Sequence, residues 1–245
     1  MKGDEIDRAK QSAREKVWTL LERERAAPLG VHGHIPKFEG ADQAAGRLAA
    51  LNVWQAARVL KTNPDKAQLP VRVRALHDGK LLYMAVPRLA TPKPFYLLDP
   101  AALTVPFERA ATSDGAASAS QTIWVDQMRR VDLIVCGSVV VNRSGVRVGK
   151  GAGYSDIEVA LLTEAGLIGP ETAIVTTVHQ LQVVDDELPE TEHDFSVDMI
   201  VTPDEVIECG PPRRPNGIVL RHLTEEKIAA IPVLAGLSSS LTQRR

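Results

Sequence analysis

A glycine-rich segment, Arg147-Val-Gly-Lys-Gly-Ala-Gly-Tyr-Ser-Asp156, places a glycine at every second position around a lysine. Glycines let the backbone turn several N–H groups toward one point and let an anion approach closely. A helix-like run from Asp156 to Ala165 follows, and its N-terminus adds partial positive charge. Arg147 and Lys150 add full charges. The segment is therefore typical of a phosphate site built on Gly149, Gly151 and Gly153.

Asp156 adds the opposite charge beside this phosphate site. A lone carboxylate in that position is best explained by Mg²⁺, which takes one or two carboxylates together with phosphate oxygens. The glycine spacing differs from Gly-x-Gly-x-x-Gly, and no Gly-Lys-Ser/Thr follows as in Walker A. The segment predicts a nucleotide polyphosphate bound with magnesium. A tight connection between a strand and a helix is the structural alternative.

Strand-like and helix-like segments alternate along the chain. Buried strands are predicted at Arg58–Thr62, Leu81–Val86, Val131–Val141 and Thr172–Val178, and a short helix at Pro70–Leu76. Asn142–Gly145 is predicted to form a turn that presents Arg147 to the glycine segment. This order predicts a single doubly wound α/β domain of three layers, α/β/α, with a mostly parallel sheet.

Composition indicates an ordinary intracellular enzyme. With 245 residues and 44% hydrophobic content, the chain can bury one sizeable core. Its 29 basic and 31 acidic side chains leave no global field for nucleic acid or for a membrane. Residues 1–25 are too charged for a signal peptide, and Cys136 and Cys209 make no disulfide framework. We expect a cytoplasmic, reduced protein.

The first helix carries two cations one turn apart. Apolar residues recur at helical spacing from Ala13 to Leu21, and Lys10 and Arg14 share one side of the same helix. The pair either forms part of a solvated helix face or reaches a common anionic ligand. Composition alone does not choose between the two.

Polar residues follow three of the predicted strands, where ligands bind in open α/β sheets. Asp65 follows the first strand, Arg88 the second and His179 the fourth. Each has a structural alternative. Asn63-Pro64-Asp65 is also a good turn, Arg88 is also a plain surface residue, and His179 is also a histidine bonded to backbone at a strand end.

Other segments carry structural predictions. Asp42 is predicted to cap a helix that runs through Leu51, and Ala110–Ser120 to form a mobile loop over the site. His32 and His34 are interpreted as exposed loop histidines because no third metal ligand stands nearby. Asp198 is predicted to be structural, and Asp194 is left open.

The C-terminal part follows a proline-rich linker at Pro211–Gly217, after which Thr224 is predicted to cap a helix ending near Ala230. The expected division is an α/β domain over residues 1–209, an extension packed on it over 210–237, and a disordered tail over 238–245.

These motifs together resemble those of the 5-formyltetrahydrofolate cyclo-ligase (methenyltetrahydrofolate synthetase) family. The similar parts are the glycine segment, Leu188-Pro-Glu-Thr-Glu-His-Asp-Phe-Ser-Val-Asp198 and Ile200-Val-Thr-Pro203. The resemblance extends from Lys10 to about Glu208. Gly-Tyr-Ser-Asp-Ile-Glu, ending at Glu158, is most similar to the synthase domain-containing branch.

The resemblance implies that ATP phosphorylates the formyl oxygen of 5-formyltetrahydrofolate and that ring closure then gives 5,10-methenyltetrahydrofolate. ATP and Mg²⁺ are the implied cofactors. Asp156 would hold Mg²⁺, while Tyr154 would contact both ATP and the substrate ring, with Asp65, Arg88 and His179 as further substrate residues. The implied phosphate ligands are Lys10, Arg14, Arg147, Lys150 and the loop glycines.

One position departs from the family pattern. Cyclo-ligases carry two adjacent tyrosines before the aspartate, whereas this chain has Tyr154 followed by Ser155, which cannot stack on a flat ring. Two alternatives therefore stand beside the folate reaction. One is ATP-dependent activation of a different N-formyl or amide compound, for example one linked to thiamine precursors. The other is a non-catalytic protein that binds folate or nucleotide.

Overall fold

The computed structural model describes residues 3–236. Its α-helices include α1 (Gly3–Arg23), α2 (Ala41–Ala49), α3 (Asn52–Ala56), α4 (Leu69–His77), α5 (Phe107–Ala110), α6 (Ser113–Ala119), α7 (Tyr154–Glu164) and α8 (Glu225–Ala230). Its strands are β1 (Val59–Thr62), β2 (Leu81–Ala85), β3 (Phe95–Leu98), β4 (Gln121–Ile123), β5 (Leu133–Cys136), β6 (Val140–Asn142), β7 (Arg147–Val148), β8 (Ala173–Thr177), β9 (Val183–Val184), β10 (Met199–Val201) and β11 (Val206–Glu208).

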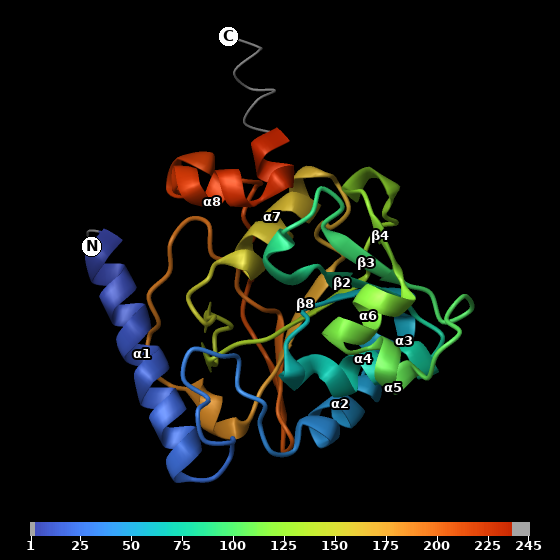
Figure 1. The fold of residues 1–245 in the computed structure, drawn as a ribbon. Helices are drawn as coiled ribbons and strands as arrows, with labels where there is room; N and C mark the ends of the chain where they lie inside the picture. Colours follow the sequence, from blue (N-terminus) through green and yellow to red (C-terminus); the bar gives the residue numbers. More distant parts are fainter. Residues whose placement is uncertain (1–2, 237–245) are drawn as a thin grey trace.

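The main sheet has eight strands in the order β11-β10-β8-β5-β1-β2-β3-β4. The five central strands, β10 to β2, are mutually parallel, and the pairings at both edges are antiparallel. Helices cover both faces, as Figure 1 shows. The predicted three-layer, mostly parallel fold is confirmed, although the sequence patterns did not indicate the antiparallel edge strands.

Two hydrophobic cores lie on opposite faces of this sheet, because successive strand residues point to opposite sides. On one face, β-strand residues such as Leu60 and Val135 pack with Trp18 of α1 and Leu48 of α2. On the other face, Ile134 belongs to a second core that also holds the apolar residues of α7 and the buried Ile231 and Leu234 beyond α8. α7 and α8 therefore belong to one layer.

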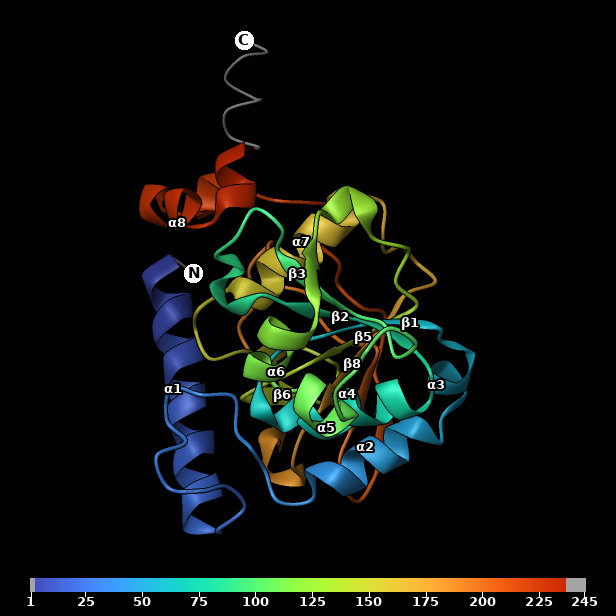
Figure 2. The same cartoon turned by 45° about the vertical axis from the view of Figure 1, so that its right-hand side comes forward.

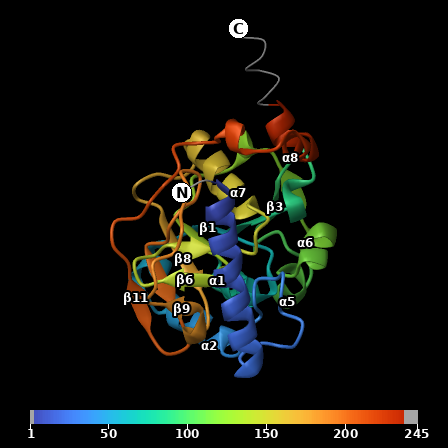
Figure 3. The same ribbon diagram turned by 90° about the vertical axis from the view of Figure 1, so that its left-hand side faces the viewer.

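α1 and α8, the helices nearest the two ends of the described chain, lie against different parts of the fold. In Figures 1 and 2, α8 lies at the opposite end of the molecule from α2. Figure 3 shows α1 running along the face of the molecule turned to the viewer, in front of β6. Contacts of α1 with β6 and β7 hold it there. Within residues 3–236, no helix is both long enough and apolar enough to cross a lipid bilayer.

The predicted strand at Val131–Val141 is divided in two. β5 ends at Cys136, and the chain re-enters a strand at Val140 as part of a separate sheet, β7-β6-β9. Gly137 lies at the break, where an added Cβ would come within 2.8 Å of the Gln68 Oε1 atom. The apolar run is continuous in sequence because both halves are buried, β5 in the main sheet and β6 in the small sheet. The turn at Asn142–Gly145 is confirmed by a hydrogen bond from the Gly145 N–H to the Asn142 carbonyl.

Two local predictions were wrong. Residues 110–120 do not form a loop, because α5 and α6 occupy most of this segment and Ala111 and Ala116 are fully buried. Asp42 does not cap α2. The N-cap is Gly40, whose φ of 84° suits glycine, and the helix ends at Ala49. Thr224 does cap α8, since its side chain accepts a hydrogen bond from the Lys227 N–H.

Candidate active site

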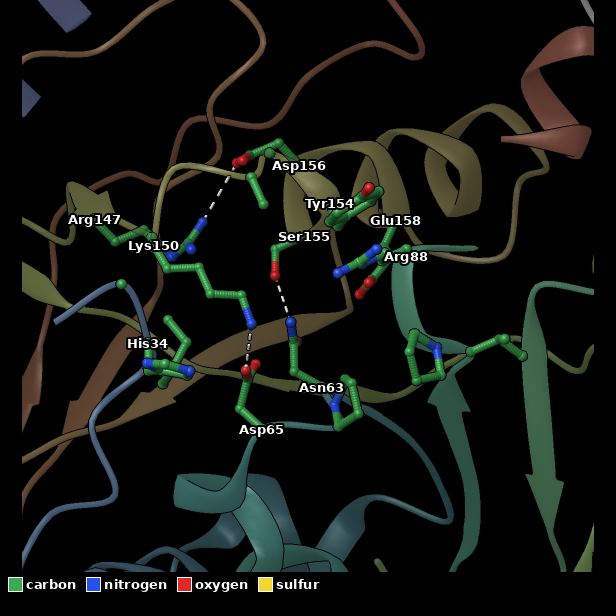
Figure 4. Close-up of a pocket in the computed structure, with 18 residues that line it drawn as sticks. His34, Asn63, Asp65, Arg88, Arg147, Lys150, Tyr154, Ser155, Asp156 and Glu158 are labelled. Atoms are coloured by element: carbon green, nitrogen blue, oxygen red, sulfur yellow. Dashed lines mark hydrogen bonds and ion pairs between the residues drawn. The ribbon is translucent and has the colours of Figure 1, made fainter. Parts of the chain in front are cut away.

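A cavity of about 400 Å³ lies at the carboxyl ends of β1 and β2. Residues 63–65 and 86–88, which follow these strands, form one side of it, and the glycine segment with the first turn of α7 forms the other. Figure 4 shows the labelled side chains converging on this space. The position is the one expected for a ligand in a parallel α/β sheet.

A smaller cavity of about 120 Å³ lies on the other side of the glycine segment. Lys10 and Arg14 of α1 line it, together with Asp194. Arg147 and Asp156 line both cavities, as do Gly149 and Gly153. The loop from Gly149 to Gly153, here called the glycine loop, therefore separates two compartments that share a cation and a carboxylate.

The conformation of the glycine loop requires glycine at two positions. Gly151 has φ of 99° and Gly153 has φ of 66°, both in the region that side-chain-bearing residues rarely adopt. Gly153 is also the N-cap of α7, so the loop leads directly into the helix N-terminus. Arg14 holds the other end of the loop, because its Nε donates to the Gly149 carbonyl over 2.6 Å.

Arg147 is fixed in place on several sides. Its Nη1 lies 3.3 Å from Asp156 Oδ1, its Nη2 donates to the Gly137 carbonyl, and its guanidinium carbon lies 4.5 Å from the centre of the Phe195 ring. Burial raises the pKa of the Asp156 carboxyl, and the Arg147 charge opposes that shift. A bound cation would favour the ionised carboxylate.

Lys10 forms a buried ion pair with Asp194, with 2.5 Å between Nζ and Oδ2. Asp194 also accepts hydrogen bonds from the backbone and hydroxyl of Thr191. Burial alone would raise the pKa of Asp194, but the Lys10 and Thr191 contacts hold it below its ordinary value. Burial also lowers the pKa of Arg14. The role of Asp194, undecided from sequence, is to anchor Lys10 at the small cavity.

Tyr154 and Arg88 both line the larger cavity, as does His34. Arg88 stands on a strained backbone, since it and Leu89 have φ of 60° and 51°. Such conformations in residues other than glycine cluster at ligand sites. Asp65 reaches across the cavity to Lys150, which Figure 4 marks with a dashed line.

His179 lines neither of these two cavities. Its Nδ1 accepts a hydrogen bond from the Leu181 N–H, and its ring packs edge-on against Phe38. Burial lowers the pKa of His179. The structure therefore does not bring His179 to the cavity where the substrate was expected. It places His179 as the structural alternative described it, a histidine bonded to backbone at a strand end.

Asp198 has the structural role that the sequence suggested. Its carboxylate accepts a hydrogen bond from the Ile174 N–H at the start of β8, and Arg214 pairs with it. The backbone of Asp198 also bonds to Ile174 and to Cys209. Asp198 thus ties β8 to the β10–β11 edge.

Two buried charges at the base of the larger cavity were missed. Lys61 of β1 donates to Glu158 of α7, and both side chains are almost completely buried. Lys61 also donates to Asn63 Oδ1 over 3.2 Å, and Asn63 in turn donates to Ser155 Oγ. The sequence did contain a signal for this pair. Lys61 lies inside an apolar strand and Glu158 lies among the apolar residues of a helix, and charged residues are rarely buried unless they are paired.

Asp156 is the candidate magnesium ligand that the sequence suggested. Among the residues described, no cluster of three or more His, Cys, Asp or Glu side chains could hold a metal ion. Within the same residues, Asp156 is the carboxylate that lines both cavities. This donor set suits Mg²⁺, which needs few protein ligands when phosphate oxygens complete its shell.

Comparison with known proteins agrees with these features. The chain is 41% identical to the methenyltetrahydrofolate synthase domain-containing protein of Mus musculus over 236 residues, which cover 94% of this chain and 63% of that protein. The corresponding Homo sapiens protein is 39% identical, with 94% of this chain and 61% of that protein covered. The chain thus spans less than two thirds of the length of these relatives.

A solved structure has the same fold. The NMR structure of Aquifex aeolicus 5,10-methenyltetrahydrofolate synthetase aligns with a TM-score of 0.53 and 20% identity, over 84% of this chain and 93% of that chain. The model of the 5-formyltetrahydrofolate cyclo-ligase family matches residues 6–203. This range includes the cations of α1, the glycine loop and Asp194. Because the match extends over most of the sequence and takes in both cavities, the chain belongs to the 5-formyltetrahydrofolate cyclo-ligase family.

Proposed function

We propose that this protein is an ATP- and Mg²⁺-dependent ligase that converts 5-formyltetrahydrofolate to 5,10-methenyltetrahydrofolate. The observation that carries the proposal is the pair of cavities that meet at the glycine loop and share Arg147 and Asp156. Two ligands that exchange a phosphoryl group must meet at such a boundary. Family membership supports the same reaction.

The smaller cavity suits the ATP phosphates, and Lys150 would contact the γ-phosphate from the larger cavity, on the other side of the glycine loop. Lys10 and Arg14 line it, and the glycine loop supplies backbone N–H groups at its wall. Cations and oriented N–H groups neutralise the charge that a transferred phosphoryl group carries. Arg147 lines both cavities, where it would contact the phosphoryl group on the donor and on the acceptor.

Asp156 would hold Mg²⁺ at this boundary, together with oxygens of the nucleotide. When bound, Mg²⁺ would supply Lewis-acid neutralisation of the phosphate oxygens. Arg147, 3.3 Å from Asp156 Oδ1, keeps that carboxylate oriented toward both compartments.

The larger cavity suits the formylated substrate. Its volume of about 400 Å³ falls within the usual range for small-molecule sites. Tyr154 offers an aromatic face, while Asp65 and Arg88 offer polar groups of both charges. Arg88 would form a bidentate ion pair with a substrate carboxylate. No covalent nucleophile is needed, since the enzyme acts by positioning.

The reaction balances in two steps. The formyl oxygen attacks the γ-phosphorus of ATP and ADP leaves. The neighbouring folate nitrogen then attacks the activated formyl carbon and gives up its proton to water, and the carbon–oxygen bond breaks to release inorganic phosphate. The protein's contribution is to hold the formyl oxygen against the shared boundary of the two cavities.

A second candidate is ATP-dependent activation of a different N-formyl or amide compound. Ser155 favours it, because this residue replaces an aromatic ring of the family pattern and accepts a hydrogen bond from Asn63 at the larger cavity. The phosphate-binding side would be unchanged. A non-catalytic binding protein is a third outcome of the same experiment.

The test is an assay of the purified chain with Mg-ATP and 5-formyltetrahydrofolate, following methenyl absorbance and ADP release together. Equal amounts of the two products support the folate reaction. ADP release that requires another formyl compound, such as a formylated aminopyrimidine, replaces it with the second candidate. If calorimetry shows that Mg-ATP binds but no ADP is released in the presence of either compound, the chain is a non-catalytic binding protein.

A further inference from the structure

α8 brings a third cation against the glycine loop. Lys227 Nζ donates to the Ala152 carbonyl and lies 4.8 Å from the centre of the Tyr154 ring. A Cβ added to Gly153 would lie 3.4 Å from the same Nζ atom. Lys227 lies beyond residues 6–203, the part that the family model matches.

α8 is held firmly enough to position this side chain. Thr224 caps the helix through the Lys227 N–H, so the turn that carries Lys227 is fixed at its start. Ile231 and Leu234, just beyond the helix, are fully buried against the α7 side of the sheet. Upstream, the Ile218 N–H donates to Glu164 of α7. Lys227 therefore stands on a docked segment.

Lys227 and Arg14 hold the glycine loop by carbonyl groups at its two ends. Arg14 binds the Gly149 carbonyl, and Lys227 binds the Ala152 carbonyl. In a trans peptide, the C=O and the following N–H point in opposite directions. Each cation therefore turns one loop N–H, that of Lys150 or of Gly153, away from itself. Arg14 and Lys227 thereby hold these two loop peptides in one orientation.

The shared carboxylate, Asp156, also acts on the charge of Lys227. Burial lowers the pKa of the Lys227 ammonium, and the charge of Asp156 opposes that shift. A cavity of about 360 Å³ lies beside α8, lined by Lys227 and also by Gly151, Gly153 and Asp156. It adjoins the smaller cavity, which these last three residues also line.

We propose that Lys227 is a positioning residue of the nucleotide site, which sets the Ala152–Gly153 peptide in the orientation that binds phosphate. The nucleotide part rests on the proposed function, whereas the hold on the loop does not. Loss of Lys227 would then weaken ATP binding more than binding of the formyl substrate, whose cavity Lys227 does not line. A residue that merely packs α8 onto the fold would have no such selective effect.

The experiment compares the full-length wild type with Lys227→Met, Lys227→Arg and a control on the same helix, Glu226→Gln. Met keeps the length of the side chain but removes its charge and its donors, whereas Arg keeps both. Thermal unfolding identifies variants that are folded. If Lys227→Met does not fold, Lys227→Gln replaces it, because glutamine retains a donor that is not charged.

The first measurement needs no ligand. Hydrogen–deuterium exchange of the backbone amides in residues 149–153 should be faster in Lys227→Met than in wild type, and close to wild type in Lys227→Arg and Glu226→Gln. Unchanged exchange in a folded Lys227→Met protein overturns the proposal. This outcome is independent of whether the chain uses ATP.

The second measurement is steady-state kinetics. Lys227→Met should raise the KM for Mg-ATP by roughly 10-fold, as expected for loss of one charged hydrogen bond, and should raise the KM for the formyl substrate much less. Lys227→Arg should recover most of the loss. An equal rise in both KM values, or no recovery with arginine, overturns the positioning role. Failure of the wild type to bind ATP would refute the proposed function and leave the exchange result standing.

Discussion

Lys150 and Asp65 face one another across the larger cavity, with 2.9 Å between Nζ and Oδ1. The lysine comes from the glycine loop and the aspartate from the segment after β1, so the ion pair joins the two walls of the cavity. Lys150 is partly exposed, and surface ion pairs contribute little stability. Lys150 can therefore exchange Asp65 for a phosphate at small cost.

Lys150→Ala should weaken Mg-ATP binding by roughly 1.5–3 kcal/mol, the range for hydrogen bonds to charged groups. The physical reason is that backbone N–H groups alone do not replace a full charge. Isothermal calorimetry measures the effect. Lys66→Ala, an exposed lysine that lines neither cavity of the site, is the matched control. Equal affinity in a folded Lys150→Ala protein would remove Lys150 from the phosphate site.

Asp156→Asn should abolish Mg²⁺-dependent turnover while leaving the midpoint of thermal unfolding nearly unchanged. Asparagine keeps the shape of the side chain but loses the charge that attracts the metal. Turnover is measured over a range of Mg²⁺ concentrations, with Glu171→Gln, an exposed carboxylate elsewhere, as control. If the variant is destabilised but stays active with an unchanged magnesium dependence, Asp156 serves only to hold Arg147.

Tyr154→Ala should impair use of the formyl substrate far more than binding of ATP, because aromatic stacking contributes about 0.5–1.5 kcal/mol beyond area burial. Ser155→Tyr restores the family's pair of tyrosines and should raise turnover of 5-formyltetrahydrofolate. The variant also removes the Ser155 hydroxyl that Asn63 binds. Both effects are measured as kcat/KM for each substrate.

The folate reaction is contradicted by one combined result. Wild type would show no turnover of 5-formyltetrahydrofolate, Ser155→Tyr would gain none, and ATP would still bind. That result favours a different formyl or amide substrate.

Lys61→Met should lower the free energy of unfolding by about 3–5 kcal/mol, because it leaves the buried Glu158 without its partner. Burial raises the pKa of Glu158, and Lys61 opposes that shift. Replacing both residues, as Lys61→Met with Glu158→Leu, should recover most of the loss, since no charge then remains buried. Denaturant unfolding of the two single variants and the double variant completes the cycle. A loss below about 1 kcal/mol in Lys61→Met would show that water reaches the pair, as at exposed pairs.

His179 should contribute a pH dependence to stability and none to substrate specificity. Because burial lowers its pKa in the folded protein, the unfolded chain takes up a proton first as the pH falls through the ordinary value of 6.5. Stability therefore decreases with falling pH below about 6.5. His179→Gln should flatten this slope in urea unfolding and leave the KM for the formyl substrate unchanged. A large rise in that KM would return His179 to the site.

Several site residues could be placed from sequence because strand ends converge. Asp65 and Arg88 follow neighbouring parallel strands, and the carboxyl ends of such strands meet at one edge of the sheet. The glycine loop was recognisable because its backbone geometry demands glycine. Both kinds of signal are local in sequence, so they can be recognised without knowledge of the fold.

The missed features depend on tertiary contacts or on tight packing. Lys61 was unrecognised because its partner lies 97 positions away on α7. α5 and α6 were taken for a loop because small residues there carry no periodic apolar signal. Their smallness is itself a packing requirement: a Cβ on Gly115 would lie 1.7 Å from the Arg109 carbonyl oxygen. His179 was predicted to contact substrate because it follows a strand, but that position does not determine where its side chain points.

Arg14 and Lys227 hold the same short loop from distant parts of the sequence, and this bears on how the chain acquires its site during translation. The Ala152 carbonyl precedes its partner by 75 residues. At the usual rate of synthesis, those residues take roughly 4–15 s to add. During that interval a nascent chain already contains the loop, α1 and most of the sheet, but the loop has only one of its two supports. The ability to bind phosphate would thus mature only after Lys227 has left the ribosome.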